Sequence, residues 1–281
     1  MGPAARLASA GGVALVLLLV ISAAAAPGAM AQEETEDELE FSYVPGAENG
    51  PEHWGSIKPQ WSTCGTGMMQ SPIDLSHDRV KLVPSLGYLN LSYRPADASV
   101  VNRGHDIMVN FSGDAGSLVI NETAYYLKQL HWHTPSEHTI DGHRFAMELH
   151  LVHESAENKA AVIGMLYKFG AHDKFLRKLE PYIKQIADRR DKVEHVGVVD
   201  PRLVRGSDSV YYRYMGSLTT PPCKEGVIWT ILKEVRTVSM YQRELLREAV
   251  DDGMENNARP LQKVNNRDIS IFWPKPHRHY Y

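Results

Sequence analysis

Short apolar and β-branched runs, separated by Gly, Pro, Asn and Asp, dominate the chain from about Leu86 to Tyr167. Runs of this length bounded by turn residues are typical of β-strands. The clearest are Asp106 to Phe111, Ser117 to Ile120, Tyr125 to His133, Ala146 to His153 and Ala161 to Phe169. The pattern predicts a protein built mostly from sheet.

Two later segments, Lys174 to Asp188 and Tyr241 to Val250, carry apolar residues at helical spacing. The apolar face of the first is formed by Phe175, Leu176, Leu179, Ile183 and Ile186, and it continues past Pro181. That of the second is formed by Leu245, Leu246, Ala249 and Val250. We expect both helices to pack on the outside of the sheet, which makes the fold class α+β, predominantly β.

Composition narrows the class of protein. The 281 residues show no Gly/Ser linker, repeat or low-complexity tract after Phe41, which favours a single domain. Apolar residues at 43% and charged residues at 23% are ordinary for a soluble globular chain. The formal net charge of −4 lacks the basic excess of a nucleic-acid binder, so no nucleic-acid partner is expected.

The first 31 residues read as a signal peptide. Arg6 supplies a positive charge, Val13 to Ile21 is an apolar run, and Ala29-Met30-Ala31 fits a small-x-small cleavage site. The apolar run is too short to span a bilayer, so no membrane anchor is expected. Cleavage after Ala31 leaves a mature chain of residues 32–281 that opens with an acidic stretch, for which we expect a solvated leader.

Other features agree with export. The chain has two cysteines, Cys64 and Cys223, and an even count in an oxidising compartment suggests one bridge. Three sequons, at Asn90, Asn110 and Asn121, are candidate glycosylation sites. We therefore expect a secreted glycoprotein.

Most of the candidate metal-binding residues lie between Gln129 and His153. Residues two apart in a strand point to the same side, so Gln129, His131 and His133 share one face of their predicted strand. Glu148 and His150 share a face of the next. Two neighbouring strands can then bring three imidazoles together, which is the ligand set of a catalytic zinc site.

The two other polar residues on these faces fit a supporting role. Gln129 and Glu148 each stand two positions before a histidine, where a partner for the second ring nitrogen is needed. Three further histidines compete as ligands: His153 faces the other way, and His138 and His143 fall in a loop and a turn. The alternative is a set of histidines without metal.

A second constellation runs from Gly216 to Cys223. Its two consecutive prolines exclude a paired strand and predict a rigid loop. A threonine hydroxyl on such a loop can both accept and donate a hydrogen bond. On its own this loop is equally well explained as a tight turn.

Taken together, the motifs resemble the alpha-class carbonic anhydrases, and in particular the exported plant-type members. The resemblance runs from about Phe41 to Trp273 and rests on these motifs, in this order: Asn49 to Trp54, Gln70 to Ile73, Asn102 to His105, Gln129 to His133, Ser136 to His138, Glu148 to His153, Gly216 to Pro222 and Asn257 to Pro260.

The resemblance implies one catalytic domain, residues 32–281, around a large, twisted, mainly antiparallel sheet of about ten strands. It also implies a Cys64–Cys223 disulfide and cis peptide bonds at Ser71-Pro72 and Pro221-Pro222.

The resemblance also assigns roles in the site. It makes His131, His133 and His150 zinc ligands, oriented by Gln129, Glu148 and the carbonyl of Asn257. It implies that Thr219 accepts a hydrogen bond from zinc-bound hydroxide and donates one to Glu137. The apolar pocket for carbon dioxide is then lined by Val152, Val162, Leu218, Val227 and Trp229, with Thr220 at its edge.

His105 matches the proton relay of the family, and Tyr43 is a weaker match to a tyrosine of its solvent network, because the spacing before Asn49 differs. Two residues depart from the animal members, Arg103 beside the relay and Met108 in the cleft. We expect them to alter the rate rather than the reaction.

The function implied is zinc-dependent, reversible hydration of carbon dioxide to bicarbonate and a proton, by attack of zinc hydroxide. Two alternatives share the fold, a catalytically weak storage or binding protein and a broader zinc esterase. The expected location is extracellular, with a plastid reached through the secretory route as the alternative.

Overall fold

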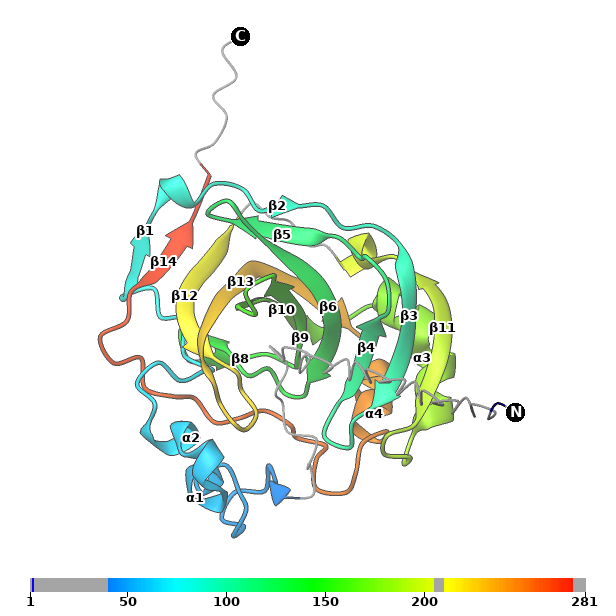
Figure 1. Cartoon of the computed structure of the whole chain (residues 1–281). Coiled ribbons are helices and arrows are strands. Elements are labelled where there is room, and N and C mark those ends of the chain that lie inside the picture. Colours follow the sequence, from blue (N-terminus) through cyan, green and yellow to red (C-terminus); the bar gives the residue numbers. More distant parts are fainter. Residues whose placement is uncertain (1, 3–39, 205–209, 275–281) are drawn as a thin grey trace.

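A computed structural model describes residues 2, 40–204 and 210–274 of the chain (Figure 1). The predicted signal peptide, its cleavage site and most of the acidic leader lie outside these residues. No helix in the described part of the chain is both long and apolar enough to cross a membrane.

Fourteen strands occur among the described residues. They are β1 (Val80–Leu82), β2 (Asn90–Leu91), β3 (Ala96–Asn102), β4 (Ile107–Phe111), β5 (Ser117–Ile120), β6 (Thr123–His133), β7 (Thr139–Ile140), β8 (His143–Arg144), β9 (Met147–Ser155), β10 (Ala160–Phe169), β11 (Val193–Val199), β12 (Tyr211–Ser217), β13 (Glu225–Val238) and β14 (Ile269–Phe272).

The helices are few and mostly short. The α-helices are α1 (Trp54–Ile57), α2 (Thr63–Thr66), α3 (Lys174–Ile186) and α4 (Met240–Arg247), and the 3₁₀ turns are η2 (Pro59–Trp61), η3 (Pro84–Leu86) and η4 (Pro201–Val204). The predicted α+β, predominantly β class is confirmed.

Twelve of the strands form one sheet, which curves around the centre of the molecule in Figure 1. Ten follow the order β1-β14-β12-β13-β10-β9-β6-β4-β3-β11, and β5 joins β2 to β6 beside this path. The β10–β13 and β1–β14 pairs are parallel and the other pairs are antiparallel. The sheet is thus mainly antiparallel, with two strands beyond the ten expected.

The two predicted helices lie outside the sheet, as expected. Helix α3 packs on β3 and β11, and α4 packs on α3. Asp173 begins α3 by accepting hydrogen bonds from the backbone amides of Phe175 and Leu176, which satisfies two donors of the first turn. Helix α4 ends at Arg247, before the predicted Val250, although Val250 is still buried.

Two apolar clusters cover the two faces of the sheet. Leu149 and Leu151 belong to the cluster under the helices, whereas Val152 belongs to a second cluster with Val162 and Trp229. Since neighbouring residues of a strand point to opposite sides, β9 separates the two clusters. The second cluster lies on the face that carries the three candidate ligand histidines, which we call the histidine face.

Covalent features match the expectation from the resemblance. Cys64 in α2 forms a disulfide with Cys223. The Ser71-Pro72 and Pro221-Pro222 peptide bonds are cis, and so is Thr134-Pro135.

Candidate metal centre

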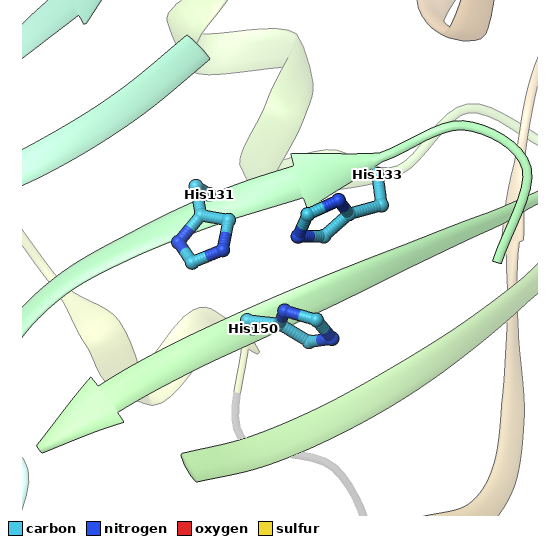
Figure 2. A group of neighbouring side chains, drawn as sticks. All are labelled: His131, His133 and His150. Carbon is cyan, nitrogen blue, oxygen red and sulfur yellow. The ribbon is translucent and has the colours of Figure 1, made fainter. Parts of the chain in front are cut away.

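Three histidines from two neighbouring strands meet on the histidine face (Figure 2). His131 and His133 come from β6, and His150 lies directly opposite His131 on β9. The ring centroids are 5.0 Å apart for His131 and His133, 5.2 Å for His131 and His150, and 4.5 Å for His133 and His150. All three rings are buried, and each offers a nitrogen within 4.8 Å of the others.

The His131 ring is oriented by Gln129. The Nδ1 atom of His131 lies 2.8 Å from Oε1 of Gln129. Because an amide oxygen only accepts, Nδ1 carries the proton and Nε2 keeps its lone pair. The structure brings together the pair that the strand pattern predicted.

The His133 ring is held by the backbone of Asn257. Nδ1 of His133 donates to the Asn257 carbonyl at 2.7 Å, and Nε2 is buried with no hydrogen-bond partner among the described residues. The Asn257 side chain is itself fixed, since it donates to the carbonyls of His105 and Trp132 and accepts from the Thr134 amide. The lone pair at Nε2 is therefore left for a ligand in the site.

The His150 ring is held by Glu148. Nε2 of His150 lies 2.9 Å from Oε1 of Glu148, which leaves Nδ1 for a ligand. Burial alone raises the pKa of Glu148, but the neighbouring rings of His138 and His150 outweigh it and keep the pKa well below its usual range. Glu148 is therefore a carboxylate inside the protein.

These donors fit a zinc ion. Burial is the main cause that lowers the pKa of His131 and of His133, so both rings are neutral and keep a lone pair near neutral pH. Three imidazoles with hydrogen-bonded second nitrogens, and one buried nitrogen without a hydrogen-bond partner among the described residues, match a zinc site that keeps a position open. His131, His133 and His150 would hold the ion.

His138 has a role that the sequence analysis missed. It is fully buried, with Nδ1 lying 2.7 Å from Oε1 of Glu148 and Nε2 lying 2.7 Å from the Tyr214 hydroxyl. Both ring nitrogens are engaged, so His138 orients Glu148 and is not available as a ligand. No periodic pattern marks a residue in a loop, and the Ser136 to His138 motif of the resemblance was the one sequence signal at this position.

The other competing histidines lie away from the centre. His153 points to the opposite face, with Nε2 lying 2.7 Å from the Tyr93 hydroxyl and Nδ1 lying 3.1 Å from the Ala161 carbonyl. Burial lowers the pKa of His153 to about 4. His143 is exposed in β8.

Glu137 lies beside the centre, but it does not form the hydrogen bond expected with Thr219. Oε1 of Glu137 accepts from the Arg259 amide at 2.9 Å. Oε2 has no hydrogen-bond partner among the described residues and lies 3.7 Å from Nε2 of His133. The Thr219-to-Glu137 hydrogen bond implied by the resemblance is therefore absent, because this oxygen is turned toward His133. Thr219 is itself buried.

The loop that carries Thr219 is fixed at its start. Ser217 accepts from the Ser71 amide at 2.9 Å through its hydroxyl, which in turn donates to the Leu218 carbonyl at 2.7 Å. The indole of Trp229 donates to the Ser217 carbonyl at 2.9 Å. These contacts, rather than proline alone, make the loop rigid.

The predicted pocket residues gather in one buried cluster beside the histidines. It contains Val152, Val162, Leu218, Val227 and Trp229. The Trp229 ring lies 4.8 Å from that of His150. Thr220 is buried next to this loop, and its hydroxyl has no hydrogen-bond partner among the described residues.

His105 lies at the tip of the β3–β4 hairpin and is only 1% exposed. Its ring meets that of Phe41 at 5.6 Å, and Nε2 lies 3.6 Å from Oδ2 of Asp106. Arg103 donates two hydrogen bonds to the Asp106 carboxylate, of 2.8 and 2.5 Å. Burial would raise the pKa of Asp106, but the charges of Arg103 and the nearby histidines outweigh it and lower the pKa.

Two further residues from the resemblance have clear positions. Tyr43 is buried, with its ring 5.7 Å from that of Phe41 and 5.4 Å from that of Trp54. Met108 is half-buried on β4 and pairs with His131 across the strands.

The chain is thus a β protein with a large curved sheet and a buried trio of histidines that could hold a metal ion. Residues 49–272 match the family model of eukaryotic-type carbonic anhydrase, and the chain belongs to this family.

Similar proteins cover most of the chain. This chain is 50% identical over 246 residues to Alpha carbonic anhydrase 7 of Arabidopsis thaliana. The match covers 88% of this chain and 90% of that protein. This chain is 51% identical over 238 residues to Dioscorin dioA3 of Dioscorea japonica. The match covers 85% of this chain and 88% of that protein.

Solved structures agree on the fold. A dioscorin complexed with ascorbate is 50% identical with a TM-score of 0.83, covering 84% of this chain and 99% of that one. The alpha-carbonic anhydrase of Thermovibrio ammonificans, in complex with the inhibitor sulfanilamide, is 36% identical with a TM-score of 0.73. The match covers 82% of this chain and 98% of that one.

Proposed function

We propose that the protein is a zinc-dependent carbonic anhydrase that reversibly hydrates carbon dioxide to bicarbonate and a proton. The observation that carries this proposal is the geometry of His131, His133 and His150. Each ring has one nitrogen hydrogen-bonded by a partner of its own, and the three rings offer possible ligand nitrogens within 4.8 Å of one another.

Bound zinc supplies a Lewis acid that makes water acidic enough to serve as a nucleophile near neutral pH, a chemistry for which carbonic anhydrases are the standard example. The residues of the chain do the rest. Gln129, the Asn257 carbonyl and Glu148 fix the tautomer and direction of each ring. The Glu148 carboxylate also balances part of the positive charge of the centre.

The apolar wall binds and orients the substrate. Carbon dioxide has no net charge or dipole, so a surface such as that of Val152, Val162 and Trp229 suits it better than a polar one. The wall also excludes water from the side where the carbon atom must approach.

Glu137 and Thr219 orient the attacking water. Glu137 keeps one buried oxygen without a hydrogen-bond partner among the described residues, and in this proposal it turns from His133 to accept from the Thr219 hydroxyl. A hydroxyl that donates to a carboxylate presents its own oxygen as an acceptor. Thr219 can then hold the attacking water with a lone pair turned toward the carbon.

Each hydration releases one proton, which must leave the centre. We assign this step to His105, which the resemblance matches to the proton relay and which lies at the tip of the β3–β4 hairpin. Asn257 holds the two segments together, since its side chain donates to the backbone carbonyl of His105 and its own carbonyl accepts from His133.

The proposal includes export. Residues 1–31 act as a signal peptide, and Asn90, Asn110 and Asn121 are exposed, as acceptors of glycans must be. The Cys64–Cys223 disulfide fits an oxidising compartment. We place the mature protein outside the cell, with a plastid reached by the secretory route as the alternative.

Stopped-flow hydration of carbon dioxide by the mature protein, with metal analysis of the same sample, tests the proposal. We expect one zinc per chain and rapid hydration, with both lost together in His133→Ala. His143→Ala is the matched control, because His143 is an exposed histidine of β8 outside the centre. Full zinc content in His133→Ala would contradict the ligand assignment.

One observation supports a second candidate, a catalytically weak storage or binding protein on this fold. The dioscorins resemble this chain as closely as the named carbonic anhydrases do, so overall identity does not separate the two functions. Zinc-loaded protein without hydration activity would favour the second candidate, and ester cleavage in excess of hydration would favour a broader zinc esterase.

A further inference from the structure

The register of four antiparallel strands connects one predicted glycosylation site to the metal centre. Asn110 on β4 lies directly opposite Gln129 on β6, and Gln129 lies opposite Val152 on β9. Residues opposite each other in a sheet point to the same side. Asn110 therefore lies on the histidine face, in one row with Gln129, which orients His131, and with Val152 of the apolar wall.

Exposure changes sharply along this row. Val152 and Gln129 are buried, whereas Asn110 is exposed, and Ser99, the next residue outward on β3, is half-buried. Strands lie about 4.8 Å apart, which places Asn110 roughly 5 Å from Gln129 and 10 Å from Val152 along the row. Asn110 thus marks the solvent edge of the histidine face.

The Asn110 side chain is available for modification. It makes no hydrogen bond to other residues in the described part of the chain, and Ser112 completes an Asn-Phe-Ser sequon. The core neighbours Val109 and Phe111 point to the opposite face, so a group attached at residue 110 does not disturb packing.

The other two sequons lie far from the centre. Asn121 sits in the turn before β6, eight residues before Gln129, or roughly 27 Å along an extended strand. Asn90 on β2 pairs with Val119 of β5, and Val119 pairs in turn with Ala124 of β6. Ala124 is five residues before Gln129, so Asn90 also lies away from the centre. These two sites are natural controls.

We propose that Asn110 carries an N-linked glycan at the solvent edge of the histidine face, and that this glycan screens the metal centre from large molecules but not from carbon dioxide. The inference rests on the proposed function and on export. A glycan is bulky and hydrated, whereas carbon dioxide is a three-atom molecule that passes between its branches.

The modification is a group transfer during export. Nδ2 of Asn110 forms a bond to C1 of an oligosaccharide while the bond from C1 to the pyrophosphate oxygen of a lipid-linked donor breaks. The amide nitrogen gives up one proton, and the lipid pyrophosphate leaves.

Occupancy is tested first, on full-length chain expressed in a eukaryotic secretory host and analysed as glycopeptides. Asn110→Gln and Ser112→Ala should both lose the glycan at residue 110, whereas Ser112→Thr keeps the sequon and should keep it. An unmodified Asn110 in the secreted wild-type protein would overturn the inference, whatever the zinc content.

Screening is tested by a thiol placed beside the centre. Met108→Cys adds a single free thiol, because both native cysteines are in the disulfide, and it pairs with His131 on the same face. Asn110→Gln should speed its labelling by a polymer-linked maleimide several-fold and leave labelling by N-ethylmaleimide unchanged. Asn121→Gln should change neither, and the control Val198→Cys, at an exposed residue, should be labelled equally with and without the glycan.

Equal polymer labelling with and without the glycan would refute screening. This readout needs neither zinc nor turnover, so it stays informative if the proposed function fails. In active protein, Asn110→Gln should leave carbon dioxide hydration unchanged and raise the association rate of a polymer-linked sulfonamide several-fold.

Discussion

His131 and His150 face each other across β6 and β9, and a bulge in β6 makes this possible. The register shifts between Leu127 and Gln129, and Lys128 is exposed there. Before the bulge the odd-numbered Tyr125 and Leu127 pack in the cluster under the helices. After it, odd-numbered Gln129, His131 and His133 point to the opposite face.

The hydrogen bond from His131 to Gln129 should tune metal affinity. Gln129→Leu keeps the volume but leaves the Nδ1 proton of His131 without an acceptor, so the zinc dissociation constant should rise by about 10–100-fold. Competition with a chromophoric chelator measures this. Gln129→Glu keeps an acceptor and should bind zinc more tightly than Gln129→Leu; equal affinities would remove the hydrogen bond from the explanation.

Thr219 should act on turnover and not on metal binding. Thr219→Ala removes the hydroxyl proposed to orient the attacking water, so turnover should fall by on the order of tenfold to a thousandfold with zinc still bound. Thr219→Ser keeps the hydroxyl and should recover most of the rate. Unchanged turnover in Thr219→Ala would take this residue out of the mechanism.

His105 should matter mainly when buffer is scarce. Its replacement by Ala removes the proposed proton acceptor, and turnover at low buffer concentration should fall by about tenfold or more. Added imidazole should restore it, while His195→Ala, which alters an exposed histidine of β11, should have no effect. Failure of imidazole to rescue His105→Ala would show that protons leave by another route.

Acid should destabilise the fold through His153. Burial lowers its pKa from 6.5 to about 4, so between these values the unfolded chain binds the proton and the folded protein does not. The contribution of His153 to the free energy of unfolding is therefore fully present above pH 6.5. It falls by about 3 kcal/mol as the pH is lowered toward 4. Urea unfolding at several pH values measures it.

His153→Gln is the matched variant, because it cannot titrate. The stability difference between wild type and variant should shrink as the pH falls, while contributions from His131 and His133 cancel. A difference that stays constant from pH 7.5 to 4 would show that His153 does not titrate as described.

The disulfide should contribute strongly to stability. Cys64 and Cys223 are 159 residues apart, and closing a loop of that length stabilises the fold by about 4–5 kcal/mol in the chain-entropy model. The Cys64→Ser, Cys223→Ser double variant should lose this amount in urea unfolding. Reducing agent should weaken the wild type and leave the double variant unchanged.

Much of the candidate centre was predictable because strands have a period of two. That period alone placed His131 and His133 together, put Gln129 beside them, and turned His153 away. His138 lies in a loop, as expected, but its hydrogen bond to Glu148 was not predictable, because loop contacts depend on how distant segments pack. The same holds for the Glu137 contact, where the expected bond to Thr219 is not present.

The sequence by itself determined the strands, the two main helices, and which residue types carry the chemistry, because local periodicity and turn residues set those features. Only the tertiary structure decided the register of β4, β6 and β9, and therefore which residues share a row with the ligands. Register depends on a bulge and on contacts between strands far apart in the chain. Asn110 beside Gln129 and His138 beside Glu148 are consequences of that packing.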